Sequence, residues 1–69
     1  MNKGNSNFAI NFKRLMLSRK LNPTTFAREF HCDKMSAYAY SRGTVPGGER
    51  LVALAKFFNT TAEALLTQP

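Results

Sequence analysis

Residues 22–43, with the sequence NPTTFAREFHCDKMSAYAYSRG, decide the fold. Asn22 is a good helix N-cap, and Pro23 stands at the first helical position, where a helix tolerates proline. Asp33 is the expected N-cap of a second helix, and Gly43 ends it. The stretch therefore predicts two short helices separated by a tight turn.

The two predicted helices span about 23–30 and 34–41, and the turn lies near His31-Cys32-Asp33. Phe26, Ala27 and Phe30 are expected to face inward from the first helix. Because Ala27 is small, the second helix can approach it closely, as a helix-turn-helix requires.

Upstream of this stretch, apolar residues recur at i, i+4, i+7 and i+8, which predicts a helix over about 8–19. They are Phe8, Phe12, Leu15 and Met16. Ser6 or Asn7 is the expected N-cap of this helix. Ile10 and Leu17 lie off the apolar stripe and are expected to be partly exposed.

Downstream, the residues after Gly43 break the helical pattern, and a fourth helix is predicted over about 47–58. Its expected core stripe is Leu51, Val52, Leu54, Ala55 and Phe58. Asn59 is the expected left-handed residue after this helix. Thr60 and Glu63 have the spacing of a capping box, which predicts a last short helix through Leu65 and Leu66.

The expected fold class is all-α, because no segment alternates with period two for long enough to form a strand. Five short helices around one core form a compact domain that contains a helix-turn-helix. Residues 1–6 are expected to be a flexible leader and residues 7–69 a single domain. The chain has 69 residues, of which 43% are apolar, so it can bury a compact core but hardly surrounds a deep substrate cavity.

The sequence predicts a protein of a reducing compartment, the cytoplasm. Its one cysteine, Cys32, cannot form an internal disulfide. Lys3 is followed by polar residues and not by the apolar segment of a signal peptide. No apolar run approaches the roughly 20 residues that span a bilayer.

The charge of the chain favours a polyanionic partner. The net charge is +6, and residues 1–22 carry five lysines and arginines with no acidic residue. Such a distribution is typical of proteins that bind nucleic acid or an anionic membrane surface.

The sequence lacks the parts of an enzyme. His31, Cys32 and Asp33 are adjacent, and consecutive residues on a turn rarely converge on one metal ion. Gly47-Gly48 lacks the glycine spacing and the following lysine of a phosphate-binding loop. We therefore expect no catalytic residue, no metal, no cofactor and no small-molecule substrate. Cys32 is expected to be a small buried residue, and His31 to end a helix.

Taken in order, these motifs resemble the phage repressor and Cro-type helix-turn-helix family of DNA-binding proteins. The resemblance covers residues 8–66 and rests on the order and spacing of several elements. They are the apolar stripe of 8–19, Leu21-Asn22 with Phe26-Ala27 and Phe30, Arg42-Gly43, Pro46, the segment 51–58 and the segment 61–66. The resemblance implies the fold of a repressor amino-terminal domain.

The chain departs from the family pattern at several positions. Pro23 stands where the family usually has a phosphate-binding Gln, and His31 stands where the turn usually has Gly, which implies a positive φ at His31. Ala37 replaces a bulky aliphatic residue, and Tyr40 is expected to fill the space. Met16 and Ser41 replace both members of an Arg–Glu pair, so no orphaned charge is left.

The resemblance implies that the helix over 34–41 enters the major groove of DNA. Base contacts are expected from Lys34, Met35, Tyr38 and Ala39, with Lys34 donating to guanine and Met35 and Ala39 touching thymine methyl groups. Tyr38 can instead reach a phosphate, or merely pack, and Lys34 and Arg42 can be merely solvated charges. Backbone contacts are expected from Asn22, Thr24, Thr25, Ser36, Arg42 and Thr44.

The function that these expectations describe is a Cro-like phage or prophage transcriptional repressor in the bacterial cytoplasm. It would bind a palindromic double-stranded DNA operator as a homodimer, because one small domain touches few base pairs. Leu65, Leu66 and Phe57 are candidates for the dimer surface, unless they close the core of the domain itself.

Two other functions remain open at this stage. The first is a protein-interaction module on the same fold, of the antirepressor or antitoxin kind, which Pro23 and the apolar Met35 and Ala39 favour. The second is a basic amphipathic membrane binder. It is ranked last because the other four predicted helices favour a closed globular domain.

Overall fold

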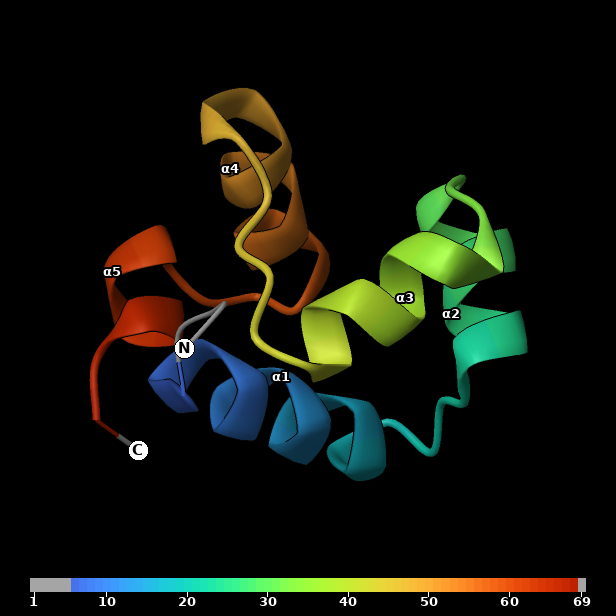
Figure 1. Cartoon of the computed structure of the whole chain (residues 1–69), viewed down its shortest axis with the longest axis horizontal. Helices are drawn as coiled ribbons and strands as arrows, with labels where there is room; N and C mark the ends of the chain where they lie inside the picture. Colours follow the sequence, from blue (N-terminus) through green and yellow to red (C-terminus); the bar gives the residue numbers. More distant parts are fainter. Residues whose placement is uncertain (1–5, 69) are drawn as a thin grey trace.

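The computed structural model describes residues 6–68, which fold into five α-helices and no strand. Figure 1 shows α2 and α3 together toward one end of α1, α5 beside its other end, and α4 rising between α5 and α3. The all-α prediction is confirmed. The helices are α1 Ser6–Ser18, α2 Pro23–Phe30, α3 Lys34–Ser41, α4 Gly48–Phe57 and α5 Ala62–Leu66.

The first helix begins earlier than predicted. Ser6 already belongs to α1, so neither Ser6 nor Asn7 is its N-cap. The predicted start of the helix was set by its first buried residue, Phe8. In the structure, polar residues before Phe8 extend the helix on its solvent side. The rest of the expected leader, residues 1–5, lies outside the described residues.

Each of the helices α1 to α4 ends in the same way. A residue with positive φ follows the helix, and the next backbone N–H donates to a carbonyl five residues back, at 2.8 to 3.0 Å. The left-handed residues are Lys20 (φ 56°), His31 (φ 62°), Gly43 (φ 101°) and Asn59 (φ 59°). This closure satisfies the last carbonyls of a helix and reverses the chain. The predictions for His31 and Asn59 are confirmed.

Side chains cap three of the helix N-termini. Asn22 accepts from the backbone of Thr25 and Thr25 accepts from the backbone of Asn22, so α2 opens with a full capping box. Asp33 caps α3 as predicted, by accepting from the N–H of Ser36. The cap of α5 is Thr61 and not Thr60. The N–H of Thr60 closes the end of α4 at 2.8 Å, which shifts the cap by one residue.

An aromatic cluster forms the core. Phe26 is fully buried, and its ring lies 5.2 to 6.4 Å from the rings of five aromatic neighbours. The five are Phe12, Phe30, Tyr40, Phe57 and Phe58. Tyr40 is only 4% exposed and fills the space beside Ala37, as predicted. Between α1 and α3, Phe8 and Phe12 make edge-on contacts with Tyr40.

One predicted position of an apolar residue is wrong, and the alternative left open for Leu65 is decided. Val52 is 48% exposed, because Leu51, Leu54 and Phe58 form the inward stripe of α4 and Val52 is rotated about 100° from Leu51. Leu65, a candidate for the dimer surface, is buried in the core. Its neighbour Leu66 packs against that core.

Two polar side chains, Asn11 in α1 and Arg19 directly after it, bind helix ends that are distant in sequence. Asn11 Nδ2 donates to the carbonyls of Ala64, Leu65 and Thr67 at 2.9 to 3.1 Å and so caps the end of α5. Arg19 Nη1 donates to the Phe57 carbonyl at 2.7 Å, and the guanidinium lies about 5.5 Å from the rings of Phe57 and Phe58. These contacts fix α1 against α4 and α5. No helix of the described residues is long and apolar enough to cross a membrane.

Candidate nucleic-acid interface

The pair α2–α3 presents the candidate interface. Three residues, 31–33, join the two helices, and the helices pack against each other. Ala27 of α2 is buried, and Ala37 of α3 has no exposed surface. These small residues allow close approach, so α3 lies on α2 with its opposite side in solvent.

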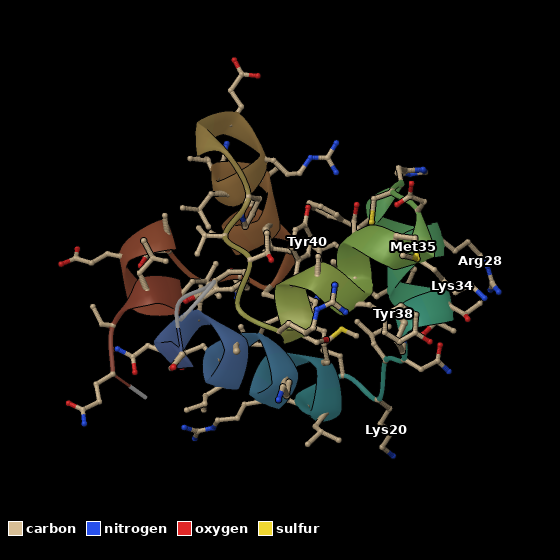
Figure 2. All side chains as sticks on the ribbon, in the orientation of Figure 1. Lys20, Arg28, Lys34, Met35, Tyr38 and Tyr40 are labelled. Atoms are coloured by element: carbon tan, nitrogen blue, oxygen red, sulfur yellow. The ribbon has the colours of Figure 1, made fainter. Side chains whose placement is uncertain are left out.

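The outward side of α3 carries a cation, an apolar side chain and an aromatic ring. Lys34 is exposed, Met35 is 70% exposed and Tyr38 is 47% exposed. Figure 2 shows these three on the outer side of α3, whereas Tyr40 lies on the side toward α4. Arg42 is exposed one turn beyond Tyr38, so it extends the same face. Ala39 is half-buried at the edge of this face.

Several of the expected backbone-contact residues are engaged within the protein. The Ser36 hydroxyl donates to the Asp33 carboxylate at 3.1 Å. The Oδ1 of Asn22 and the hydroxyl of Thr25 form the capping box of α2, which leaves the amide nitrogen of Asn22 outside the box. These groups hold the helix N-termini in place and present the backbone there.

The remaining backbone-contact candidates lie on the surface. Thr24 is exposed in the first turn of α2, and Arg42 and Thr44 are exposed after α3. The structure thus places them at both ends of the α2–α3 pair.

Sequence reasoning missed two cations near this face. Arg28 lies one turn after Thr24 on the exposed side of α2, and Figure 2 shows it at the same edge of the molecule as Lys34 and Met35. Lys20 lies at the turn between α1 and α2. The i, i+4 spacing of Thr24 and Arg28 was the available signal for Arg28. No spacing pattern in the sequence marked Lys20, because the position of its side chain depends on the left-handed backbone conformation of this residue.

The turn between the helices has a structural role. Burial raises the pKa of the Cys32 thiol, an effect that Arg50 opposes and Asp33 reinforces. Cys32 is half-buried against the core, less than predicted, and His31 ends α2 as predicted. Among the described residues, no three His, Cys, Asp or Glu side chains gather to hold a metal ion.

A shallow cavity lies between the end of α2 and the start of α4. It has a volume of about 410 Å³ and is lined by Phe30, His31, Glu49, Arg50 and Ala53. Beside it, Arg50 hydrogen-bonds to the Tyr40 hydroxyl, which raises the pKa of the guanidinium. This contact gives the hydroxyl of a buried ring its partner at the surface and links α3 to α4.

Comparisons of the chain with models of protein families, with curated proteins and with solved structures gave no significant match. Its function is therefore inferred from its residues and their geometry.

Proposed function

We propose that the protein is a helix-turn-helix transcriptional regulator that binds specific double-stranded DNA, and that it acts as a Cro-like repressor. The observation that carries the proposal is the exposed face of α3, where Lys34, Met35, Tyr38 and Arg42 stand together on a chain of net charge +6. Within residues 33–44 the one acidic side chain is Asp33, which is held as the cap of α3.

In this function α3 lies in the major groove, which is about 12 Å wide and admits a helix. The Lys34 ammonium donates to the O6 and N7 of guanine, and Met35 and Ala39 contact thymine methyl groups. Tyr38 reaches a base edge or a phosphate through its hydroxyl.

Phosphate contacts flank the groove. Thr24 and Arg28 approach the DNA backbone on the side of α2, and Arg42 and Thr44 approach it beyond the end of α3. The positive end of the α2 dipole adds to this attraction. Lys20 extends the cationic surface toward the neighbouring phosphates.

A dimer follows from the size of the domain. Its principal extents are 29 × 25 × 23 Å, and the half-sites of a palindromic operator lie about 34–36 Å apart. The longest extent is a few ångströms shorter than this spacing, so two copies docked on successive major grooves lie within reach of each other's surface side chains. A dimer of this kind reads twice as many base pairs as one domain.

Selection of bound duplexes from a randomised pool at about 150 mM salt tests the proposal, because non-specific binding is already weak there. The expected result is an enriched palindrome. Lys34→Ala should then weaken binding to the selected site by about 1–3 kcal/mol. Lys13→Ala, which removes the same charge from the exposed side of α1, should have a much smaller effect. Equal losses in the two variants would refute the proposed reading face.

A protein-interaction module is the second candidate, because Met35 is 70% exposed in the middle of the α3 face. An apolar side chain at the centre of a binding face can fill a pocket of a partner protein. In that case the selected pool stays random, and DNA binding is weak and disappears as salt is raised.

A further inference from the structure

An exposed stripe runs along α4, and its residues Glu49 and Ala53 also line the shallow cavity beside the end of α2. Glu49, Val52, Ala53 and Lys56 stand at i, i+3, i+4 and i+7, which places them on one face of the helix. All four are exposed, and Val52 is 48% exposed. The stripe thus has an apolar centre with an acidic residue on one side and a basic residue on the other.

We propose that this stripe pairs with the same stripe of a second copy, in an antiparallel arrangement around a two-fold axis, when two copies occupy adjacent half-sites on DNA. The inference rests on the proposed function. With the axis between Val52 and Ala53, Glu49 of each copy lies across from the partner's Lys56. The apolar centres meet on the axis, and two opposite-charge pairs flank them.

Charge complementarity identifies the occupant as a second copy. A chain of net charge +6 repels its own copies. On the outer side of α1, the exposed Leu17 is accompanied by Lys13 and Arg14, so two such faces would place like charges together. The stripe of α4 is different. When the second copy runs antiparallel, Glu49 of each copy lies opposite Lys56 of the other, so both pairs have opposite charges. A two-fold interface requires this self-complementarity.

The stripe is too small to hold a dimer together in dilute solution. Stable interfaces bury about 1,200–2,000 Å² in total, far more than four side chains supply. On DNA the situation differs, because two bound copies face each other at an effective concentration of order mM. Pairing through α4 therefore appears as cooperativity between half-sites.

Charge reversal provides the test on DNA. Affinity is measured on a duplex with both selected half-sites and on a duplex with one, and their ratio gives the cooperativity. Glu49→Lys and Lys56→Glu each bring two like-charge pairs together and should lower the cooperativity about fivefold, since two exposed pairs of about 0.5 kcal/mol each contribute about 1 kcal/mol together. The double variant exchanges the two charges and should restore the wild-type ratio. Loss without restoration, or no loss in either single variant, would overturn the proposed pairing.

A second test needs no DNA and separates this inference from the proposed function. In a Cys32→Ser background, Val52→Cys places a thiol near the two-fold axis, and Leu17→Cys places one on the exposed side of α1 as a control. At mM protein, oxidised glutathione should link Val52→Cys into a dimer much faster than Leu17→Cys. Equal rates would refute the pairing through α4. Fast linkage together with a random DNA pool would keep the pairing and refute the DNA-binding proposal.

Discussion

His31→Gly should stabilise the protein, although the substitution removes a side chain. His31 has φ 62° and ψ 51°, a left-handed conformation at the end of α2. This conformation costs an L-residue about 1–2 kcal/mol and costs glycine nothing. Glycine in turn gives the unfolded chain more conformational entropy, which lowers the stability of the folded state by about 0.5–1 kcal/mol. The expected net gain is about 0.5–1 kcal/mol.

The assay is thermal and urea unfolding followed by circular dichroism. For a domain of this size, 1 kcal/mol shifts Tm by roughly 4–8 °C, so the gain is well above experimental error. Lys20→Gly should give a similar gain, because Lys20 has φ 56°. Asn59→Gly should give less, because asparagine tolerates this conformation better than other L-residues.

A helical glycine serves as the control. Lys13→Gly lies inside α1 and should lower the free energy of unfolding by about 1 kcal/mol. If His31→Gly lowers Tm while Lys13→Gly behaves as expected, the backbone of His31 costs less than its dihedral angles indicate. The reasoning on the helix ends would then be wrong.

Three further predictions concern Asn11, Arg19 and the thiol. Asn11→Ala should destabilise the fold by about 1–2 kcal/mol in urea unfolding, because the end of α5 loses its capping donor; wild-type stability would show that water replaces the amide. Arg19→Lys should lower the free energy of unfolding by about 0.5–1 kcal/mol in the same assay, since lysine keeps the charge but not the planar contact with the rings. An unchanged urea midpoint would show that only the charge of Arg19 contributes. Because the pKa of Cys32 is raised in the folded state, its contribution to stability is complete below the ordinary thiol pKa of about 8.5 and declines as the pH rises above it. Wild type should therefore lose stability relative to Cys32→Ala above that pH, and parallel pH profiles would contradict the shift.

The helices could be predicted because their signals are local. The caps Asn22 and Asp33 act on N–H groups three residues away, and the apolar spacing of α1 and α2 defines their buried sides. The contacts that hold the helices together could not be predicted in this way. Asn11 binds carbonyls 53 to 56 residues further along the chain, and nothing near Asn11 marks those partners.

The candidate site was predictable in part, for the same reason. The helical phase of α3 placed Lys34, Met35 and Tyr38 outward, and the structure has them exposed. The role of Ser36 was not decided by sequence, because a serine in the first turn of a helix can bind a phosphate or the cap residue. In the structure it binds Asp33. Only the three-dimensional arrangement distinguishes these two uses.

The placement of the two tyrosines gives the protein separate optical reporters. The chain has no tryptophan, so Tyr38 and Tyr40 dominate its near-ultraviolet absorption and emission. Tyr40 is enclosed by aromatic rings and reports on whether the core is intact. Tyr38 stands in solvent on α3 and senses whatever covers that face. A Tyr38→Phe variant leaves the core signal alone, so unfolding and ligand binding can be followed independently without an attached dye.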